Sequence, residues 1–455
     1  MSRILMISSN TFAYPYPVYP LGMSMVSRDL SEKGHNVRQF DFFAEEGSEQ
    51  KLKDILRSYS PDYTGISIRN IDDVDSLSSE SGVLNNERRI VEIIRECSNA
   101  PIIAGGSALS ILPLEILEYI GADYGIVGRG EDQFPELIET LEKGEFHPRL
   151  KNDRNPDFKS PESTCPMWDK ELVDFYIARS GMLNLQTKTG CPYKCSYCVY
   201  PSLEGSRFRF RETSAVINDL ETACRLYDVD TFFFTDSIFN DPGGYYLDLA
   251  EKIIKSGLKI RWAGYFRPKG IGLKELLLLK RSGLYAVEVG SDAGCDETLS
   301  AMGKGFSFSD ILRFYNDCRQ AEIAGAYFFI FGGPSENNRT LDEGLNNIRK
   351  LEEGVIFVYS GIRILPGTKL YERALTENIL TAGDPLLEPV YYFSPGMDIE
   401  DMNNKIIHEA KRNRRYIFPP EKGKMMVDAM RAFGRKGLLW DELLSFSSIS
   451  KRRRN

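Results

Sequence analysis

Apolar residues in the first third of the chain alternate between short continuous runs and segments in which they return at helical spacing. The continuous runs lie at residues 3–8, 37–43, 63–68, 102–104 and 124–127. Between them, residues 49–59 and 86–97 carry apolar side chains every three or four positions, as amphipathic helices do. Short strands that alternate with helices at this distance predict a parallel, doubly wound, Rossmann-like sheet of five strands.

The same alternation starts again near residue 183. The strands that it predicts lie at residues 183–188, 230–235, 259–264, 285–289, 326–331 and 357–363. Helical periodicity fills the intervals, for example at 246–254 and 309–321. Six strand–helix units predict a partial (β/α)6 barrel, in which chemistry takes place at the carboxyl ends of the strands.

The segment between the two alternations is rich in Pro, Asp, Asn and Lys, which is typical of a connection between domains. Beyond residue 400 the pattern is mostly helical. The sequence therefore predicts a mixed α/β chain in four parts. These are a doubly wound domain at 1–145, a linker at 146–180, a partial barrel at 181–395 and a small helical C-terminal region at 396–455.

Composition and charge narrow the classes of protein. The formal net charge of −8 argues against a general nucleic-acid binder, which normally carries a basic face. No apolar run approaches the roughly 20 residues that a membrane-spanning helix needs, so no transmembrane segment is expected. The start, MSRILMISSN, turns polar at once and predicts a first strand, not a signal peptide. A cytoplasmic location is the resulting expectation.

Three of the eight cysteines crowd into one loop directly after a predicted strand. Cys191, Cys195 and Cys198 have the spacing C-x3-C-x2-C. Eight cysteines in 455 residues are too few for a disulfide framework, so this group indicates a metal or redox site. Three thiolates can hold three irons of a [4Fe–4S] cluster, and the fourth iron is then open to the amino and carboxylate groups of S-adenosylmethionine (SAM).

A structural zinc site is the alternative for these three thiols. Zinc normally takes four nitrogen or sulfur ligands, often from paired C-x2-C spacings. None of the three histidines is near the loop, and the other cysteines are isolated in the sequence, at residues 97, 165, 224, 295 and 318. The cluster is therefore the favoured interpretation.

Glycine-rich and polar turns follow the third, fourth and fifth predicted strands. Doubly wound sheets bind ligands beyond the carboxyl ends of their strands, and glycine lets the backbone approach a ligand closely. The alternative is that these segments are only the tight turns of a flavodoxin-like sheet. The candidate residues in these turns are Ser67, Arg69, Gly105, Gly106, Ser107, Gly128, Gly130 and Glu131.

The cysteine loop resembles the signature of the radical SAM superfamily, C-x3-C-x-aromatic-C, with Tyr197 at the aromatic position. Later segments extend the resemblance over 180–380. Gly290-Ser291-Asp292-Ala293 stands where many relatives have Gly-x-Glu-Ser, so a carboxylate is kept on a shorter side chain. The resemblance implies that the three cysteines bind a [4Fe–4S] cluster. It also implies that SAM is bound by residues from the set Tyr197, Asp236, Gly290, Asp292, Gly332, Gly333 and Arg363.

The first domain is similar to the cobalamin-binding domains that are fused to radical SAM barrels. Tyr19–Met23, Gly34–Val37 and Asp41 carry the similarity, and the turns named above continue it, so that it covers 1–380 in all. It implies that Gly22 and Met23 join the turn residues at a bound cobalamin. Many such domains supply a cobalt-binding histidine from Asp-x-His-x-x-Gly, which is missing here, so we expect no protein histidine on cobalt.

The combined resemblance implies a C-methyltransferase that acts on an unactivated carbon of a small or lipid-like metabolite. Its cluster would need an electron donor such as flavodoxin or ferredoxin. One alternative keeps both cofactors and ends in rearrangement, cyclisation or oxidation. A methylthiotransferase is disfavoured because residues 1–96 contain no cysteine for a second cluster, and a non-catalytic carrier is disfavoured by the set of barrel motifs.

Overall fold

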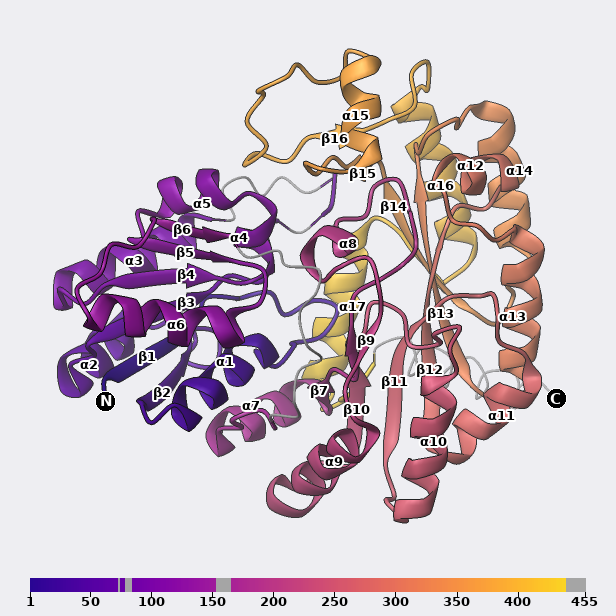
Figure 1. The fold of residues 1–455 in the computed structure, drawn as a ribbon. Coiled ribbons are helices and arrows are strands. Elements are labelled where there is room, and N and C mark those ends of the chain that lie inside the picture. Colours follow the sequence, from indigo (N-terminus) through magenta and orange to yellow (C-terminus); the bar gives the residue numbers. More distant parts are fainter. Residues whose placement is uncertain (73, 78–83, 153–164, 439–455) are drawn as a thin grey trace.

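The chain folds into two α/β bodies that lie side by side (Figure 1). The computed structural model describes residues 1–72, 74–77, 84–152 and 165–438. An N-terminal domain built on one sheet stands against a larger, barrel-like domain (Figure 1). The expected fold class, a doubly wound sheet followed by a partial barrel and a small C-terminal region, is confirmed.

The first sheet has six parallel strands in the order β2-β1-β3-β4-β5-β6. Its strands are β1 (Arg3–Ser8), β2 (Asn36–Asp41), β3 (Tyr63–Ser67), β4 (Ile102–Gly105), β5 (Tyr124–Val127) and β6 (Leu150–Asn152). The helices are α1 (Leu21–Glu32), α2 (Glu49–Tyr59), α3 (Asn85–Cys97), α4 (Ser107–Ile111), α5 (Pro113–Ile120) and α6 (Gly130–Glu142). The strand order reverses between β1 and β3, and ligands of such sheets bind at the carboxyl ends beside that point.

Local chemistry explains where helix α2 begins. At α2, the Ser48 side chain caps the helix by accepting from the backbone N–H of Lys51. Leu52, Leu56 and Tyr59 then follow at helical spacing and are buried against the sheet. Because helices cover both faces of the sheet, its strands carry nearly continuous apolar runs.

Two features of the first domain differ from the sequence prediction. The sheet has six strands, not five, since β6 pairs in parallel with β5 inside the segment predicted to be a linker. With three residues, β6 is too short to leave a hydrophobic pattern in the sequence. The same segment also contains helix α7 (Lys170–Ser180), while residues 153–164 lie outside the described residues.

The second sheet has seven parallel strands in the order β17-β14-β13-β12-β11-β10-β7. Its strands are β7 (Leu183–Leu185), β10 (Thr231–Phe234), β11 (Arg261–Phe266), β12 (Leu284–Asp292), β13 (Ala324–Phe331), β14 (Val355–Ser360) and β17 (Tyr416–Ile417). Its helices are α8 (Tyr200–Leu203), α9 (Thr213–Tyr227), α10 (Tyr245–Ser256), α11 (Leu273–Arg281), α12 (Asp296–Ala301), α13 (Phe308–Gln320), α14 (Asn338–Ile348) and α15 (Lys369–Thr376). Two small antiparallel ribbons join β8 (Lys188–Thr189) to β9 (Arg209–Phe210), and β15 (Ile362–Arg363) to β16 (Tyr391–Tyr392).

The six predicted barrel strands are confirmed, and β17 is an addition. This two-residue strand comes from the C-terminal region, which was predicted to be mostly helical, and it pairs with β14. Helices α16 (Ile399–Arg412) and α17 (Pro420–Ala432) make up most of the rest of that region up to residue 438, and 439–455 lie outside the described residues. No helix in the described part of the chain combines the length and the apolar character needed to cross a membrane.

The carboxyl ends of the two sheets meet through loops of the first domain. In the loop after β1, the ring of Tyr16 lies 5.5 Å from that of Phe233 in the barrel interior. The backbone N–H of Tyr19 donates to Oδ1 of Asn184 on β7 at 3.1 Å. Because ligands bind at the carboxyl ends of strands in both kinds of fold, this contact region is where the candidate site must be sought.

Candidate functional site

The cysteine loop is held in place by its own backbone and by the barrel around it. Gly190 has a φ of +83°, and a Cβ there would overlap the carbonyl oxygen of Arg207, so only glycine fits. The backbone N–H of Cys191 donates to the carbonyl of Gly205 at 3.0 Å. That of Ser196 donates to the carbonyl of Met302 at 2.9 Å. Contacts within the protein therefore fix the conformation of the loop.

The three predicted thiols gather in this loop. Cys191 is buried, and Cys195 and Cys198 are half-buried. Burial, and then the neighbouring thiols, raise the pKa of Cys198 to about 12, and burial also raises the pKa of Cys191. The charge of Cys195 thus acts on both Cys191 and Cys198.

A donor set of three neighbouring thiols fits a cluster that takes one thiolate at each of three irons. In the described ranges, no three His, Cys, Asp or Glu side chains are arranged to hold a metal ion. A cubane does not require convergence on a single ion, because each sulfur binds a different iron. The chemistry of the donors thus agrees with the sequence prediction.

A buried polar triad joins the cysteine loop to the end of β12 and to the turn after α12. The hydroxyl of Tyr197 donates to Oδ2 of Asp292 at 2.5 Å, and Lys304 forms an ion pair with the same carboxylate. Burial alone would lower the pKa of Lys304, but the charges of Asp292, Cys195 and Cys198 raise it overall. Asp292, predicted to bind a cofactor, is thus engaged by two side chains of the protein.

Lys304 places a positive charge near two of the thiols, where a cluster with thiolate ligands would be negative. The sequence prediction missed this role. A lysine 12 residues after Asp292 has no spacing signal of its own, because the chain must first turn through α12.

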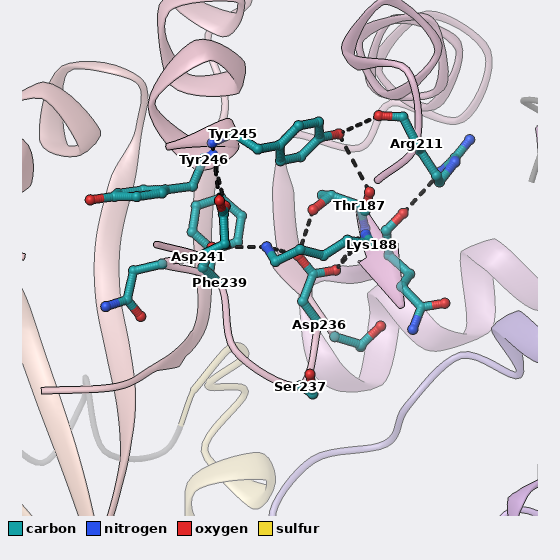
Figure 2. A network of polar contacts seen from close by, with 12 residues as sticks. Thr187, Lys188, Arg211, Asp236, Ser237, Phe239, Asp241, Tyr245 and Tyr246 are labelled. Carbon is teal, nitrogen blue, oxygen red and sulfur yellow. Dashed lines mark hydrogen bonds and ion pairs between the residues drawn. The ribbon is translucent and has the colours of Figure 1, made fainter. Parts of the chain in front are cut away.

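Asp236 lies at the centre of a second buried network (Figure 2). Its carboxylate accepts from the backbone N–H of Thr187 at 2.7 Å and from Nζ of Lys188 at 2.9 Å. Both side chains of this ion pair are essentially inaccessible, with 1% and 0% of their surfaces exposed. Lys188 also donates to the carbonyl of Phe239 at 2.8 Å (Figure 2). Asp236 therefore anchors the strand that leads into the cysteine loop instead of facing an open site.

Two further side chains hold Gly190 from opposite directions. Glu204 accepts from its backbone N–H at 3.0 Å, and Ser237 donates to its carbonyl at 2.8 Å. Burial raises the pKa of Glu204 to about 7. Neither residue was predicted: Ser237 follows the predicted Asp236 and Glu204 lies six residues after Cys198, but their partner Gly190 is 47 and 14 residues away in the sequence.

The barrel ends around the loop carry buried hydroxyls without partners. Among the described residues, the side-chain oxygens of Thr189, Ser196 and Ser291 are buried and accept or donate no hydrogen bond. Ser291 lies between the predicted residues Gly290 and Asp292 at the end of β12. Because unsatisfied buried polar atoms are costly, such hydroxyls fit a polar ligand like SAM.

Gly332 and Gly333 form the turn after β13, as predicted, and their backbone N–H groups point at a buried carboxylate. Oε2 of Glu336 accepts from them at 2.5 and 3.2 Å. Burial raises the pKa of Glu336 to about 7 despite these donors. The two backbone N–H groups of this turn are thus already bound by the side chain of Glu336.

Arg363 was predicted to bind a cofactor, but each nitrogen of its guanidinium donates to a group of the protein. Its Nε donates to Oδ2 of Asp72 at 2.6 Å, and its other nitrogens donate to the carbonyls of Ile364 and Leu386. Asp72 belongs to the loop after β3, and both side chains are 2% exposed. Arg363 is therefore a link between the two domains.

In the first domain, several predicted turn residues meet beside the switch point. The hydroxyl of Ser107 donates to the carbonyl of Arg69 at 2.6 Å. Gly106 has a φ of +103°, and a Cβ there would overlap the backbone of Ile68. Nη1 of Arg69 and Oδ1 of Asn10, at the ends of β3 and β1, are buried without a hydrogen-bond partner among the described residues. These orphaned polar atoms fit a polar ligand at the carboxyl edge of the sheet.

The remaining predicted residues divide into structural and accessible ones. A Cβ at Gly130 would contact Val26, so Gly130 serves the packing of α6 on α1. Met23 is 1% exposed and belongs to the core, whereas nothing lies within 4 Å of a Cβ at Gly22. The other members of the set stay at the carboxyl edge: Ser67 ends β3, Gly105 ends β4, Gly128 follows β5 and Glu131 begins α6 beside Arg129.

Two family models match different parts of the chain. The model of the B12 binding domain matches residues 9–138, and that of the Radical SAM superfamily matches residues 185–348. Tryptophan 2-C-methyltransferase of Streptomyces laurentii is 24% identical over 77% of this chain and 71% of its own length. An uncharacterized methyltransferase of Pyrococcus horikoshii, PH0819, is 24% identical over 82% of this chain and 84% of its own.

Among solved structures, the radical S-adenosylmethionine methyltransferase TsrM from Kitasatospora setae, with cobalamin and a [4Fe–4S] cluster bound, has the same fold. The TM-score is 0.84 at 22% identity, over 99% of both chains. A B12-binding domain at 9–138 and a radical SAM domain at 185–348 thus follow one another along the sequence. The chain therefore carries the two domains of a B12-binding radical SAM enzyme.

Proposed function

We propose that the chain is a cobalamin-dependent radical SAM C-methyltransferase that acts on an unactivated carbon of a small or lipid-like metabolite. One observation carries the proposal: the B12-binding and radical SAM domains of this chain meet at the carboxyl ends of their strands, where each binds its ligand. Relatives that cover most of the chain and are named methyltransferases support the last step of the reaction.

Residues from both domains would hold the three cofactors. Cys191, Cys195 and Cys198 would bind the cluster, with Lys304 balancing its charge. SAM would contact the cluster, Gly290 and the unsatisfied hydroxyl of Ser291. Cobalamin would lie against the carboxyl edge of the first sheet, near Arg69, Asn10, Gly22, Ser67, Gly105, Gly106, Ser107, Gly128 and Glu131. When bound, the cluster would supply an electron and the cobalamin a methyl group.

The protein's own part is to hold this geometry and to keep water out. The loop after β1 places Tyr16 against aromatic residues of the barrel interior. Arg363 and Asp72 tie the loop that carries Arg69 to the barrel. Both contacts limit the relative movement of the two cofactor sites, which a transfer between reacting atoms requires.

We further propose that no protein histidine binds cobalt. His35 precedes β2 and accepts from the backbone N–H of Ser2, and His147 precedes β6, so both belong to the amino edge of the first sheet. His408 belongs to α16 of the C-terminal region. An electron donor such as flavodoxin or ferredoxin, and a cytoplasmic location where its cysteines stay reduced, complete the proposal.

Replacement of Cys195 by Ala tests the proposal at the cluster. The variant and the wild type would be reconstituted anaerobically with iron, sulfide and cobalamin. We expect the variant to keep its corrin but to lose SAM consumption, because one iron loses its ligand. SAM consumption at the wild-type rate by the variant, or a folded wild-type protein that binds no corrin, would overturn the proposal.

A further inference from the structure

Five cationic side chains flank the cysteine loop and form what we call the basic collar. Its members come from the loop itself, from the ribbon β8–β9 and from the end of β11: Lys194, Arg207, Arg209, Arg267 and Lys269. The chain as a whole carries a net charge of −8, so this concentration of positive charge is opposite in sign to the average of the molecule.

On one side, the collar is built on the turn after Met302. The guanidinium of Arg267 lies over the ring of Tyr193, 4.4 Å from its centroid. Arg267 and Lys269 both donate to the carbonyl of Gly305 at 3.0 Å. Tyr193 stands between the first two cysteines of the motif, so these two cations are fixed directly beside the loop.

On the other side, the collar follows the ribbon that begins the loop. Arg209 pairs with Thr189 in the β8–β9 ribbon, one residue before Gly190. The backbone of Arg207 packs against Gly190, and that of Lys194 packs against Gly303. All five cations are thus placed by contacts to the cysteine loop or to the segments that hold it.

The outer part of the collar faces solvent, and in the described part of the chain its exposed cations have few acidic neighbours. Lys194, Arg207 and Lys269 are exposed, and Arg209 and Arg267 are half-buried. Asp310 lies 4.0 Å from Lys269, but it also pairs with Arg313. Within the described ranges no carboxylate forms an ion pair with Lys194 or Arg207, so exposed positive charge remains beside the site that would hold the cluster.

We propose that the basic collar is the docking surface of an acidic one-electron carrier protein, a proposal that rests on the proposed function. Helix α8, which follows the cysteines, lies against α4 of the first domain. The first domain therefore covers the α8 side of the cysteine loop. In the transfer, the carrier is oxidised by one electron and the cluster is reduced by one electron. An acidic carrier would be steered to this surface by complementary charge.

The test compares two double charge reversals in the full-length, reconstituted protein. Arg207→Glu with Lys269→Glu changes the collar and leaves the cysteine loop intact. Lys411→Glu with Arg414→Glu, at exposed positions at the end of α16 and just after it, makes the same change of charge as a control. Cluster reduction by photoreduced flavodoxin would be followed by stopped-flow absorbance at low and at physiological ionic strength. Photoreduced 5-deazaflavin, a small reductant, would be used in parallel.

We expect the collar variant to be reduced by flavodoxin about tenfold more slowly at low ionic strength, with the difference shrinking as salt is added. Its reduction by deazaflavin should stay at the wild-type rate, as should both rates of the control. Equal slowing of the two variants, or a collar variant reduced by flavodoxin at the wild-type rate, would overturn the docking proposal. Failure of the wild-type protein to consume SAM with deazaflavin would instead count against the proposed function.

Discussion

The buried ion pair between Lys188 and Asp236 allows a quantitative prediction. Asp236→Asn keeps an oxygen for the backbone N–H of Thr187 but removes the charge that faces Lys188. Breaking a buried pair by removing one partner costs about 3–5 kcal/mol, because the other charge stays buried. Lys188 retains the carbonyl of Phe239 and three aromatic rings at 4.9–5.9 Å. These offset about 1–2 kcal/mol, so we expect a net loss of roughly 1–4 kcal/mol.

A double-mutant cycle separates this electrostatic cost from simple loss of packing. In Lys188→Met with Asp236→Asn, no charge is left unpaired, and methionine suits the aromatic surroundings. We expect the double variant to be more stable than the sum of the single losses predicts, with a coupling of at least about 2 kcal/mol. Denaturant unfolding followed by tryptophan fluorescence is a suitable assay, because the ring of buried Trp262 lies 4.6 Å from that of Phe239, whose carbonyl accepts from Lys188.

The exposed pair Arg319–Glu353 provides a matched control. Its side chains are 47% and 46% exposed although two hydrogen bonds of 3.0 Å join them. A cycle on this pair should give a coupling below about 1 kcal/mol. If the Lys188–Asp236 cycle gave additive losses, or a coupling no larger than this control, the reasoning about burial would be wrong.

Three further predictions test other parts of the account. Burial raises the pKa of Glu87 to about 7, so its neutral form favours the folded state, and that stability is lost as the pH rises from about 4.5 to about 7. In denaturant unfolding, Glu87→Gln should match the wild type near pH 4 and exceed it by up to about 3 kcal/mol near pH 8, and equal stability at both pH values would contradict this. Arg363→Met should cost about 3–5 kcal/mol in the same assay, and adding Asp72→Asn should restore part of it, whereas no restoration would count against the interdomain ion pair. Ser291→Ala should leave unfolding nearly unchanged, because its hydroxyl has no partner among the described residues, and weaken SAM binding several-fold in calorimetry; unchanged affinity would remove Ser291 from the SAM site.

The sequence predicted the parts of the fold that depend on long apolar runs. The first five strands of the N-terminal sheet and all six strands of the barrel left a clear pattern, because each buries several consecutive side chains. Strands β6 and β17 have three and two residues, and their pairing is decided by the neighbouring strand instead of their own composition. No local pattern can predict such strands.

The candidate site was predicted where one short segment carries the chemistry. The cysteine triad and its aromatic neighbour lie within eight consecutive positions, so spacing alone identifies them. Arg363 and Asp72 are 291 residues apart, and the sequence shows two charges without showing that they pair. For the same reason Asp236 looked like a ligand, although the fold gives it Lys188, 48 residues away.

The most direct measurement of the central claim is the fate of a labelled methyl group. The wild-type protein and the Cys195→Ala variant, each reconstituted with cobalamin, would be incubated anaerobically with a reductant, methyl-deuterated SAM and a metabolite extract, and the products analysed by mass spectrometry. A C-methyltransferase predicts a metabolite that gains the deuterated methyl group with the wild type and not with the variant. A changed metabolite that carries no label would contradict methyl transfer and favour a rearrangement, cyclisation or oxidation.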